Sequence, residues 1–341
     1  MNLYKHALSS VFLIAVVAML LTACAPRNAP PGPGDTEPEI MIGAEETHGT
    51  LITQDGLELP LRAWLPEGDK RPTAVILAVH GFNDYSHAFA EAGQSFAEQG
   101  IAVYAYDQRG FGEAPHRGLW PGKAVLAEDL RTAANLLRQK YPGIPLHVLG
   151  ESMGGAVTVV AATTESGLPV DSLVLSAPAV WARSTQPWYQ RVALWAAVRT
   201  VPWFKPSGEG LQRQASDNIE MLRELGRDPL VLKNSRVDAI YGLVNLMDAA
   251  LAAGPELKTP TLVLYGKKDE IVPRKPVDRF WEALPNNEGH RYALYEDGWH
   301  LLLRDLQADV VISDIAAWVE EEDRDRLPFS AEVLVKERPA S

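Results

Sequence analysis

The amino-acid sequence predicts an α/β protein with a mostly parallel, doubly wound sheet and an inserted helical segment. Short apolar runs of strand length alternate with longer runs of helical periodicity, as in TAVILAVHG followed by SHAFAEAGQSFAEQG. Nearly continuous apolar strands indicate a sheet covered on both faces, which is the parallel arrangement. The alternation stops between residues 181 and 253, where the sequence has amphipathic helical stretches and no convincing strand.

The length and composition indicate how many domains to expect and exclude some classes of partner. The chain has 341 residues, of which 46% are hydrophobic and 22% charged, enough for one large domain with an insertion. Its formal net charge is −12 and it has no block rich in Lys or Arg, so we expect no nucleic-acid partner. The sequence has no HExxH motif and no clustered Cys/His spacing, so we expect no metal site and no cofactor.

Residues 1–23 read as a signal peptide. Lys5 gives a positive start, and VFLIAVVAMLL is an apolar core too short for a membrane span of roughly 20 residues. LTAC (21–24) resembles the bacterial lipobox, in which the cysteine becomes lipidated. Cys24 is the only cysteine, so it can form no internal disulfide; lipid attachment fits its position better than the alternative of a small buried side chain.

Residues 24–46 are expected to form a tether. This stretch is rich in proline, glycine and acids, which predicts an extended, solvated segment that holds the folded part off a membrane. Lipidation would place the protein in a bacterial cell envelope. Ala25 follows the cysteine where an acidic residue would retain the protein at the inner membrane, so the outer membrane is favoured.

The predicted α/β core comprises residues 47–180 and 254–322. It opens with a hairpin over 49–66, turning at Asp55-Gly56, and continues with three strand–helix units and the strand DSLVLSAP. The alternation resumes with TPTLVLYGKKDEIVP and HRYALYEDGWH. Residues 181–253 are read as a helical cap, which holds four of the nine tryptophans, and 323–341 as a charged tail without periodicity.

Three candidate catalytic residues follow predicted strands, where ligands bind in an open parallel sheet: Ser152, Asp269 and His300. Their order, serine, acid, histidine, matches the α/β-hydrolase arrangement. Gly150 and Gly154 flank the serine and would remove the side chains that collide in a sharp strand-to-helix turn. The alternative is an ordinary helix N-cap serine.

The chemistry assigns a role to each candidate. His300 would accept the proton of the Ser152 hydroxyl, and Asp269 would hold the imidazole tautomer. The backbone amides of Phe82 and Met153 are the candidate donors of an oxyanion hole.

The roles of some neighbouring residues have alternatives that the sequence leaves open. Glu270 and Asp297 compete with Asp269 for the role of the acid. His80 and Gly81 would shape their loop, and Asp107 and Arg109 are expected to form a buried structural ion pair or loop hydrogen bonds.

The motifs together resemble the monoglyceride lipase and lysophospholipase group of serine α/β hydrolases. The resemblance covers about residues 48–320 and rests on HGFNDYS, YDQRGFG, GESMGG, YGKKDEIVP and YEDGWH. It implies Ser152 as nucleophile, Asp269 as acid, His300 as base, and Phe82 and Met153 as oxyanion donors. The chain departs from the group after RGFG, where it has EAPHRG and lacks the usual serine or threonine.

These features lead us to expect hydrolysis of a lipid-like carboxylic ester, such as a monoacylglycerol or a lysophospholipid, through an acyl-serine. A tryptophan-rich cap over the serine would supply an apolar acyl site. Two alternatives remain: a peptidase or amidase of the same fold, which a buried acidic pair near the site would favour, and a non-catalytic lipoprotein that binds an acyl ligand.

Overall fold

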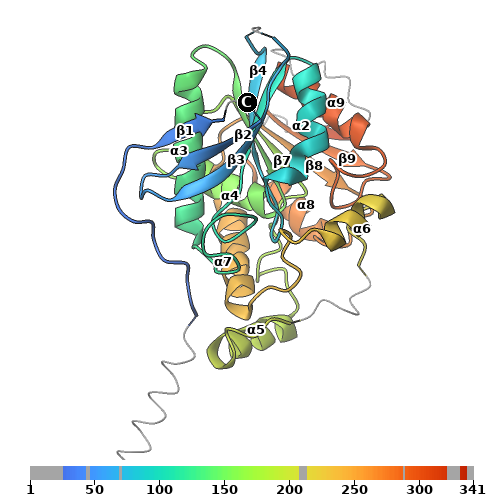
Figure 1. Ribbon diagram of the computed structural model, residues 1–341. Coiled ribbons are helices and arrows are strands. Elements are labelled where there is room, and N and C mark those ends of the chain that lie inside the picture. Colours follow the sequence, from blue (N-terminus) through green and yellow to red (C-terminus); the bar gives the residue numbers. More distant parts are fainter. Residues whose placement is uncertain are drawn as a thin grey trace, which may run out of the picture.

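A computed structural model describes residues 26–43, 47–68, 71–206, 213–286, 289–320 and 331–335 (Figure 1). The predicted signal peptide and Cys24 lie outside these residues. The fold is built on one sheet that crosses the middle of the molecule, with helices on both faces, as the sequence predicts.

Within the described residues, the sheet has ten strands in the order β1-β2-β3-β5-β4-β6-β7-β8-β9-β10. Strands β4 to β9 pair in parallel, whereas β1, β2, β3 and β10 pair antiparallel at the two edges. The strands are β1 (Glu39–Ile42), β2 (His48–Ile52), β3 (Glu58–Trp64), β4 (Ala74–Val79), β5 (Ile101–Tyr106), β6 (Leu146–Glu151), β7 (Ser172–Ser176), β8 (Thr261–Gly266), β9 (His290–Tyr295) and β10 (Glu332–Val335).

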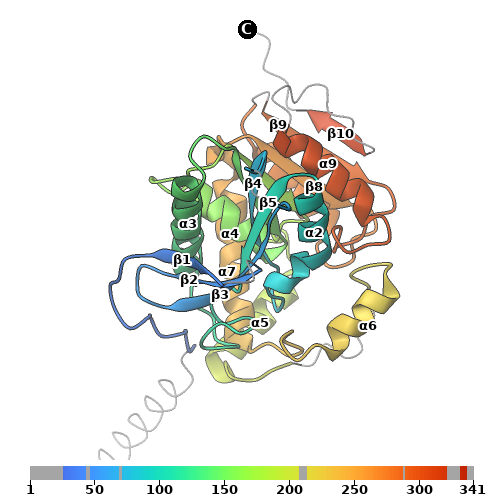
Figure 2. The same cartoon turned by 45° about the horizontal axis from the view of Figure 1, so that its top comes forward.

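The helices divide between the two faces. Helices α2 (Ala90–Glu98) and α9 (Ala308–Glu320) pack on one face, and α3 (Lys123–Lys140) and α4 (Met153–Ala162) on the other (Figure 2). Helix α8 (Arg274–Ala283) packs on the same face as α3 and α4, because its buried side chains belong to the same hydrophobic cluster. Short 3₁₀ helices span Ser86–Phe89 and Gly254–Glu256. Because helices cover both faces, every residue of strands β4 to β9 is buried, which explains their continuous apolar sequences.

The segment between β7 and β8 is helical. It contains α5 (Trp188–Thr200), α6 (Ile219–Arg227) and α7 (Val237–Ala253). Helix α7 and the 3₁₀ helix that follows it, Val237–Glu256, are together apolar and long enough to cross a membrane, yet α7 packs against α4 and α5 as a helix of the fold does. Helix α5 lies at the lower end of the molecule in Figure 1, beyond α7.

Residues 26–43 are mostly exposed, but the prediction that 24–46 forms a free tether is wrong for the residues that the structure describes, because they are bonded to the fold. The Ala29 N–H donates to the carbonyl of Trp120, and the Gly34 N–H donates to that of Asp55. Strand β1 then pairs with β2, with Ile40 opposite Leu51. An edge strand offers unpaired backbone groups, so a short alternating segment can add to it without an apolar core of its own.

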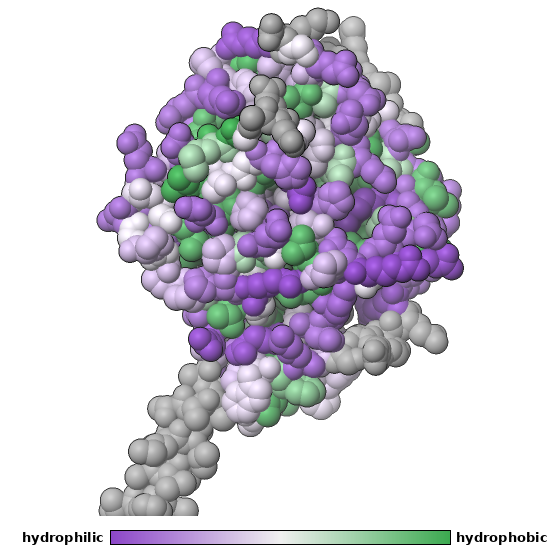
Figure 3. All heavy atoms as spheres, viewed as in Figure 1, coloured by the Kyte–Doolittle hydropathy of each residue, from purple (hydrophilic) through white to green (hydrophobic). Residues whose placement is uncertain are grey.

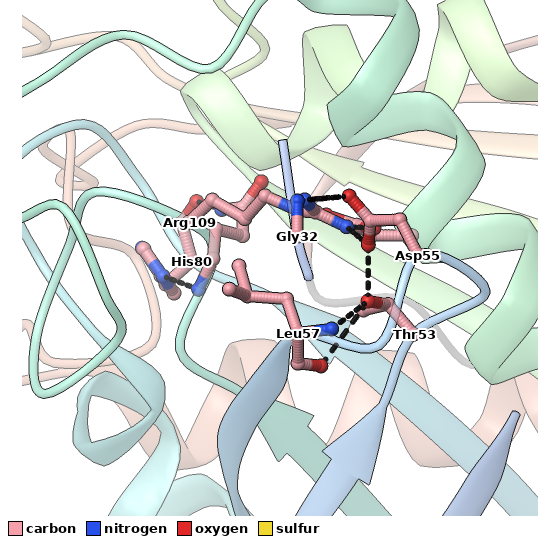
Figure 4. A network of polar contacts seen from close by, with 8 residues as sticks. Gly32, Thr53, Asp55, Leu57, His80 and Arg109 are labelled. Atoms are coloured by element: carbon pink, nitrogen blue, oxygen red, sulfur yellow. Dashed lines mark hydrogen bonds and ion pairs between the residues drawn. The ribbon is translucent and has the colours of Figure 1, made fainter. Parts of the chain in front are cut away.

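A buried ionic network fixes this N-terminal addition to the sheet (Figure 4). Asp55, at the hairpin turn, accepts hydrogen bonds from the Gly32 N–H at 2.7 Å and from Thr53 Oγ1 at 2.6 Å. Arg109 bridges Asp55 and Asp129, with N···O distances of 2.6 Å to each. Arg109 therefore has a structural role, as expected, but it forms its ion pairs with Asp55 and Asp129 and not with Asp107.

Asp107 instead accepts loop hydrogen bonds from Ser86 and Glu113.

The prediction that 323–341 is a tail without periodicity also needs correction, because Glu332–Val335 forms β10 and pairs with β9, with Val333 opposite Ala293. As at β1, the pairing depends on a free edge that the local sequence does not reveal.

Candidate active site

The turn at Ser152 is strained. Ser152 follows β6 and precedes α4, with φ 52° and ψ −111°, in a region that non-glycine residues seldom adopt. Its N–H donates to the carbonyl of Ser176 at 2.8 Å, which ties the turn to β7. A Cβ at Gly154 would lie 1.9 Å from the carbonyl oxygen of Val79, and one at Gly150 would lie 2.7 Å from Gly154. Both glycines are required, as predicted.

Three side chains converge at the carboxyl edge of the sheet. His300 Nε2 lies 3.0 Å from Ser152 Oγ, and His300 Nδ1 lies 2.8 Å from Asp269 Oδ2. The Asp269 and His300 side chains are 0% and 6% exposed. The convergence expected from their strand-end positions is thus present, with serine, imidazole and carboxylate joined in one hydrogen-bonded chain.

The backbone orients Asp269. Its Oδ1 accepts hydrogen bonds from the N–H groups of Ile271, at 2.7 Å, and Val272, at 3.0 Å, which leaves Oδ2 directed at the imidazole. The two competing acids point elsewhere: Glu270 accepts from the Gln214 N–H, and Asp297 pairs with Lys268. The structure therefore joins Asp269, and neither competitor, to His300.

The environment changes the basicity of His300. Burial alone would lower the pKa of its imidazole, but the charge and hydrogen bond of Asp269, together with the charge of Glu151, outweigh that effect, so the pKa is raised above its usual 6.5. Because Asp269 accepts a hydrogen bond at Nδ1, the neutral ring carries its proton there and presents an unprotonated Nε2 to Ser152. A hydroxyl facing an imidazole lone pair is the arrangement of an activated nucleophile.

Phe82 and Met153 both adjoin the serine. Met153 is the first residue of α4, where backbone N–H groups lack helical partners, and Phe82 lines the same cavity as Ser152. A Cβ at Gly81 would lie 3.4 Å from the Ser152 Cβ, so the loop after β4 passes close to the serine. Within the described part of the chain, no hydrogen bond uses the N–H of Phe82 or Met153. Both amides are free to donate to an oxyanion.

His80 holds that loop in place. Its Nε2 accepts a hydrogen bond from the Gln108 N–H at 2.9 Å, and Nδ1 lies 2.8 Å from the Gly81 carbonyl. Burial lowers the pKa of His80, which keeps the ring neutral. The Phe82 ring packs edge-on against Phe111, with the ring centroids 5.5 Å apart.

Sequence reasoning missed a buried charged cluster beside the serine. Arg304 Nη2 lies 2.8 Å from Asp84 and 2.9 Å from Glu151, the residue before Ser152. Burial raises the pKa of Glu151, and the charge of Arg304 opposes that effect. The charged residues next to apolar stretches, Glu151 after HVLG and Arg304 after LLL, are the signal that could have revealed the cluster.

A largely apolar cavity opens at Ser152. Its volume is about 410 Å³, within the range of small-molecule sites. Its apolar lining comes from the loop after β4, the helical segment between β7 and β8, and the turns after β8 and β9: Phe82, Ala179, Trp181, Ala215, Leu225, Val231, Leu243, Met247, Ile271, Val272 and Leu301. A cavity with such a lining suits an apolar group placed next to the serine.

Comparison with known proteins gives relatives over most of the chain. It is 27% identical over 277 residues to a monoglyceride lipase of Rattus norvegicus, covering 79% of this chain and 89% of the relative. It is 26% identical over 294 residues to a monoacylglycerol lipase of Mycolicibacterium smegmatis, covering 82% and 99%.

Solved structures give the same fold. The chain matches a monoacylglycerol lipase of Paleococcus ferrophilus with a TM-score of 0.64 and 21% identity, over 77% of this chain and 99% of that one. The family model described as serine aminopeptidase, S33, matches residues 70–307, which include all three converging side chains. The chain has the α/β-hydrolase fold and belongs to the family described as serine aminopeptidase, S33.

Proposed function

We propose that this protein is a carboxylic ester hydrolase that cleaves monoacylglycerol-like lipid esters through an acyl-serine. The observation that carries the proposal is the hydrogen-bonded chain from Ser152 through His300 to Asp269 at the end of an apolar cavity. The two relatives named as monoglyceride or monoacylglycerol lipases support the same substrate class.

The geometry supports a two-step reaction. Ser152 Oγ attacks the acyl carbon while His300 Nε2 takes the hydroxyl proton, and the Phe82 and Met153 amides donate to the oxyanion. The intermediate collapses, His300 returns the proton to the departing alcohol, and the acyl group stays on Ser152. Water then attacks the acyl-serine with His300 again as base, which releases the carboxylic acid and restores the serine.

We further propose that residues 181–253 act as a cap that completes the acyl site. The contribution of Trp181, Leu225, Leu243 and Met247 to the cavity lining supports this role. The apolar character of the site would make hydrolysis depend on the length of the acyl chain.

Charge near the serine favours an ester with a neutral alcohol. Four carboxylates, those of Asp84, Glu91, Glu224 and Asp228, line a neighbouring hollow, with Arg304 among them. A phosphate group there would meet like charges. We therefore expect monoacylglycerol to be a better substrate than lysophospholipid.

The buried cluster of Arg304, Asp84 and Glu151 bears on the alternative that the protein is a peptidase. A buried acidic pair, Asp84 and Glu151, does lie near Ser152, but both carboxylates bond to Arg304, which already supplies the cation that a substrate α-amino group would provide. The arrangement favours ester substrates over peptides with a free amino terminus.

The test uses a fluorophosphonate probe and a substrate panel. We expect labelling of the wild type and none of Ser152→Ala, and cleavage of monoacylglycerol and p-nitrophenyl acyl esters at rates that change with chain length. A folded wild type that is not labelled would exclude the catalytic proposal. Faster cleavage of an aminoacyl amide than of every ester would exclude the substrate class.

We also propose that Cys24 is lipidated after removal of residues 1–23 and anchors the protein in a bacterial envelope, at the outer membrane. The lipobox-like LTAC and the absence of any other cysteine support this. Metabolic labelling with an alkyne-bearing palmitate should mark the wild type and not Cys24→Ser. Absence of label on the exported wild type would refute it.

A further inference from the structure

Arg304 lies where three segments of the candidate active site meet. It follows His300 by four residues, in the loop after β9. Its Nη2 lies 2.8 Å from Asp84, in the loop after β4, and 2.9 Å from Glu151, the last residue of β6. One guanidinium therefore connects the segments that carry the base, an oxyanion donor and the nucleophile.

The contact with Asp84 holds the turn that presents the Phe82 N–H. The Asp84 N–H donates to the Gly81 carbonyl at 3.3 Å, which closes a turn that contains Phe82. The Asp84 Oδ1 accepts a hydrogen bond from the Tyr85 N–H at 2.9 Å, whereas Oδ2 faces Arg304. Both oxygens of this carboxylate have partners, so the turn cannot shift without breaking one of these contacts.

The contact with Glu151 acts on the nucleophile. Glu151 directly precedes Ser152, whose φ of 52° persists only because the surrounding structure fixes it. A Cβ at Gly81 would lie 3.4 Å from the Ser152 Cβ and 3.6 Å from Glu151 Oε1. The carboxylate that Arg304 holds therefore lies between the strained serine and the turn of the oxyanion donor.

The backbone of Arg304 belongs to the turn that carries the base. The Arg304 N–H donates to the Leu301 carbonyl at 2.8 Å, and the Trp299 N–H donates to the Asp305 carboxylate at 2.7 Å. These two hydrogen bonds enclose His300 from both sides along the chain. A displacement of Arg304 is thus passed to the imidazole.

The three charged side chains of this cluster lie inside the protein. Arg304, Asp84 and Glu151 are 7%, 7% and 1% exposed. Charged residues usually stay in water, and many hydrophilic side chains cover the surface seen in Figure 3. The cost of taking charges out of water offsets much of their attraction, so a buried ion pair is by itself a weak source of stability.

Arg109 shows how this protein pairs a buried guanidinium for stability. Its Nε, Nη1 and Nη2 donate to both oxygens of Asp55 and both oxygens of Asp129. Arg304 instead uses Nη2 for both of its carboxylates, and no described group bonds to Arg304 Nε or Glu151 Oε2. Buried polar atoms without partners reduce what such a cluster contributes to stability. Its place beside the serine points to a role in the reaction.

We propose that Arg304 is a positioning residue that holds the oxyanion donor, the serine and the imidazole in the arrangement that the transition state requires. The role rests on the proposed function, because this arrangement matters only if Ser152 reacts. The oxyanion exists only after Ser152 Oγ has attacked the acyl carbon, so misplacement of the three segments should affect kcat more than KM.

The test replaces Arg304 with methionine, which removes the guanidinium. Fluorophosphonate labelling carried to completion counts the competent serines. We expect kcat per labelled serine on a soluble p-nitrophenyl ester to fall about 100-fold, with KM changed less than about threefold. Arg109→Met is the matched control, because Arg109 is also buried between two carboxylates. It should lower the Tm and keep the wild-type kcat per labelled serine.

A trifluoromethyl ketone gives a second readout. Ser152 Oγ adds to its carbonyl carbon, His300 takes the hydroxyl proton, and the carbonyl oxygen becomes an oxyanion. Its inhibition constant should rise about 100-fold in Arg304→Met and stay unchanged in Arg109→Met. A loss of folded protein would lower the number of active serines and leave this constant unchanged.

A triple variant separates positioning from stability. Arg304→Met leaves two buried carboxylates without their cation, and the additional changes Asp84→Asn and Glu151→Gln remove those charges. We expect the triple variant to have a higher Tm than Arg304→Met and a kcat that stays about 100-fold below wild type.

The pH profile separates positioning from charge. The cation of Arg304 lowers the pKa of His300, and the carboxylates of Asp269 and Glu151 raise it. A role through that pKa alone would restore the wild-type rate at alkaline pH, where His300 is neutral in every variant. We expect the deficit of Arg304→Met to remain there.

The outcomes distinguish this proposal from the proposed function. A folded wild type that is neither labelled nor active overturns both. An active wild type overturns the positioning role alone if Arg304→Met keeps the wild-type kcat per labelled serine and the wild-type inhibition constant. Recovery of the wild-type rate in the triple variant, or at alkaline pH, also overturns it, in favour of stability or charge respectively.

Discussion

The substitution Asp269→Asn tests the catalytic arrangement through the tautomer of His300. The N–H groups of Ile271 and Val272 donate to Asp269 Oδ1 at 2.7 and 3.0 Å, so the carbonyl oxygen of an asparagine would stay at that position. The asparagine NH₂ would then face His300 Nδ1. Two donors cannot meet there, so the ring must move its proton to Nε2, which faces Ser152.

An imidazole protonated at Nε2 cannot accept the serine proton. We therefore expect kcat to fall about 10⁴-fold, which corresponds to about 5 kcal/mol of transition-state stabilisation. The pH profile adds a second readout. In the wild type, activity is lost as pH falls through a pKa raised above 6.5, because protonated His300 is not a base. Without the carboxylate, burial lowers that pKa, so the acid limb of the residual activity moves to lower pH.

The assay is hydrolysis of a soluble p-nitrophenyl ester from about pH 5 to 8, with thermal unfolding to establish that the variant folds. Asp297→Asn is the matched control, since Asp297 pairs with Lys268 at the surface and should leave the rate unchanged. A folded Asp269→Asn variant with more than about a tenth of wild-type kcat would contradict the tautomer argument.

Two further predictions concern packing and buried charge. Gly154→Ala places a methyl group 1.9 Å from the Val79 carbonyl, so we expect a lower Tm and at least about a 100-fold loss of kcat/KM, whereas Gly226→Ala, with open space around it, should match wild type in activity. Arg109→Met leaves Asp129 buried without its cation, which should cost about 3–5 kcal/mol. Burial already raises the pKa of Asp129 to about 6, and the loss of Arg109 raises it further, so thermal scans should find a smaller deficit at acidic pH, where the carboxyl is neutral; an equal deficit at alkaline pH would contradict this.

The sequence by itself was enough to predict the alternation of strands and helices in the α/β core and the three side chains that converge at its edge. Apolar runs as short as TLVLYG are typical of strands covered on both faces, and the carboxyl ends of parallel strands share one edge. That rule brings Ser152, Asp269 and His300 together although they lie 117 and 31 residues apart along the chain. The need for glycine on both sides of Ser152 could also be predicted from the sequence, because only a residue without a side chain fits so tight a turn.

Tertiary structure decided features that depend on which distant groups meet. Asp269 and Glu270 are adjacent and chemically similar. Asp269 reaches His300 because two backbone N–H donors direct its carboxylate toward the imidazole. Strands β1 and β10 are short and mostly exposed, so their pairing depends on free sheet edges and not on their own hydrophobicity. The placement of Arg304 between Asp84 and Glu151 likewise follows from the folded geometry, because hydrogen-bond partners of buried charges are chosen by proximity in space, which local sequence patterns do not encode.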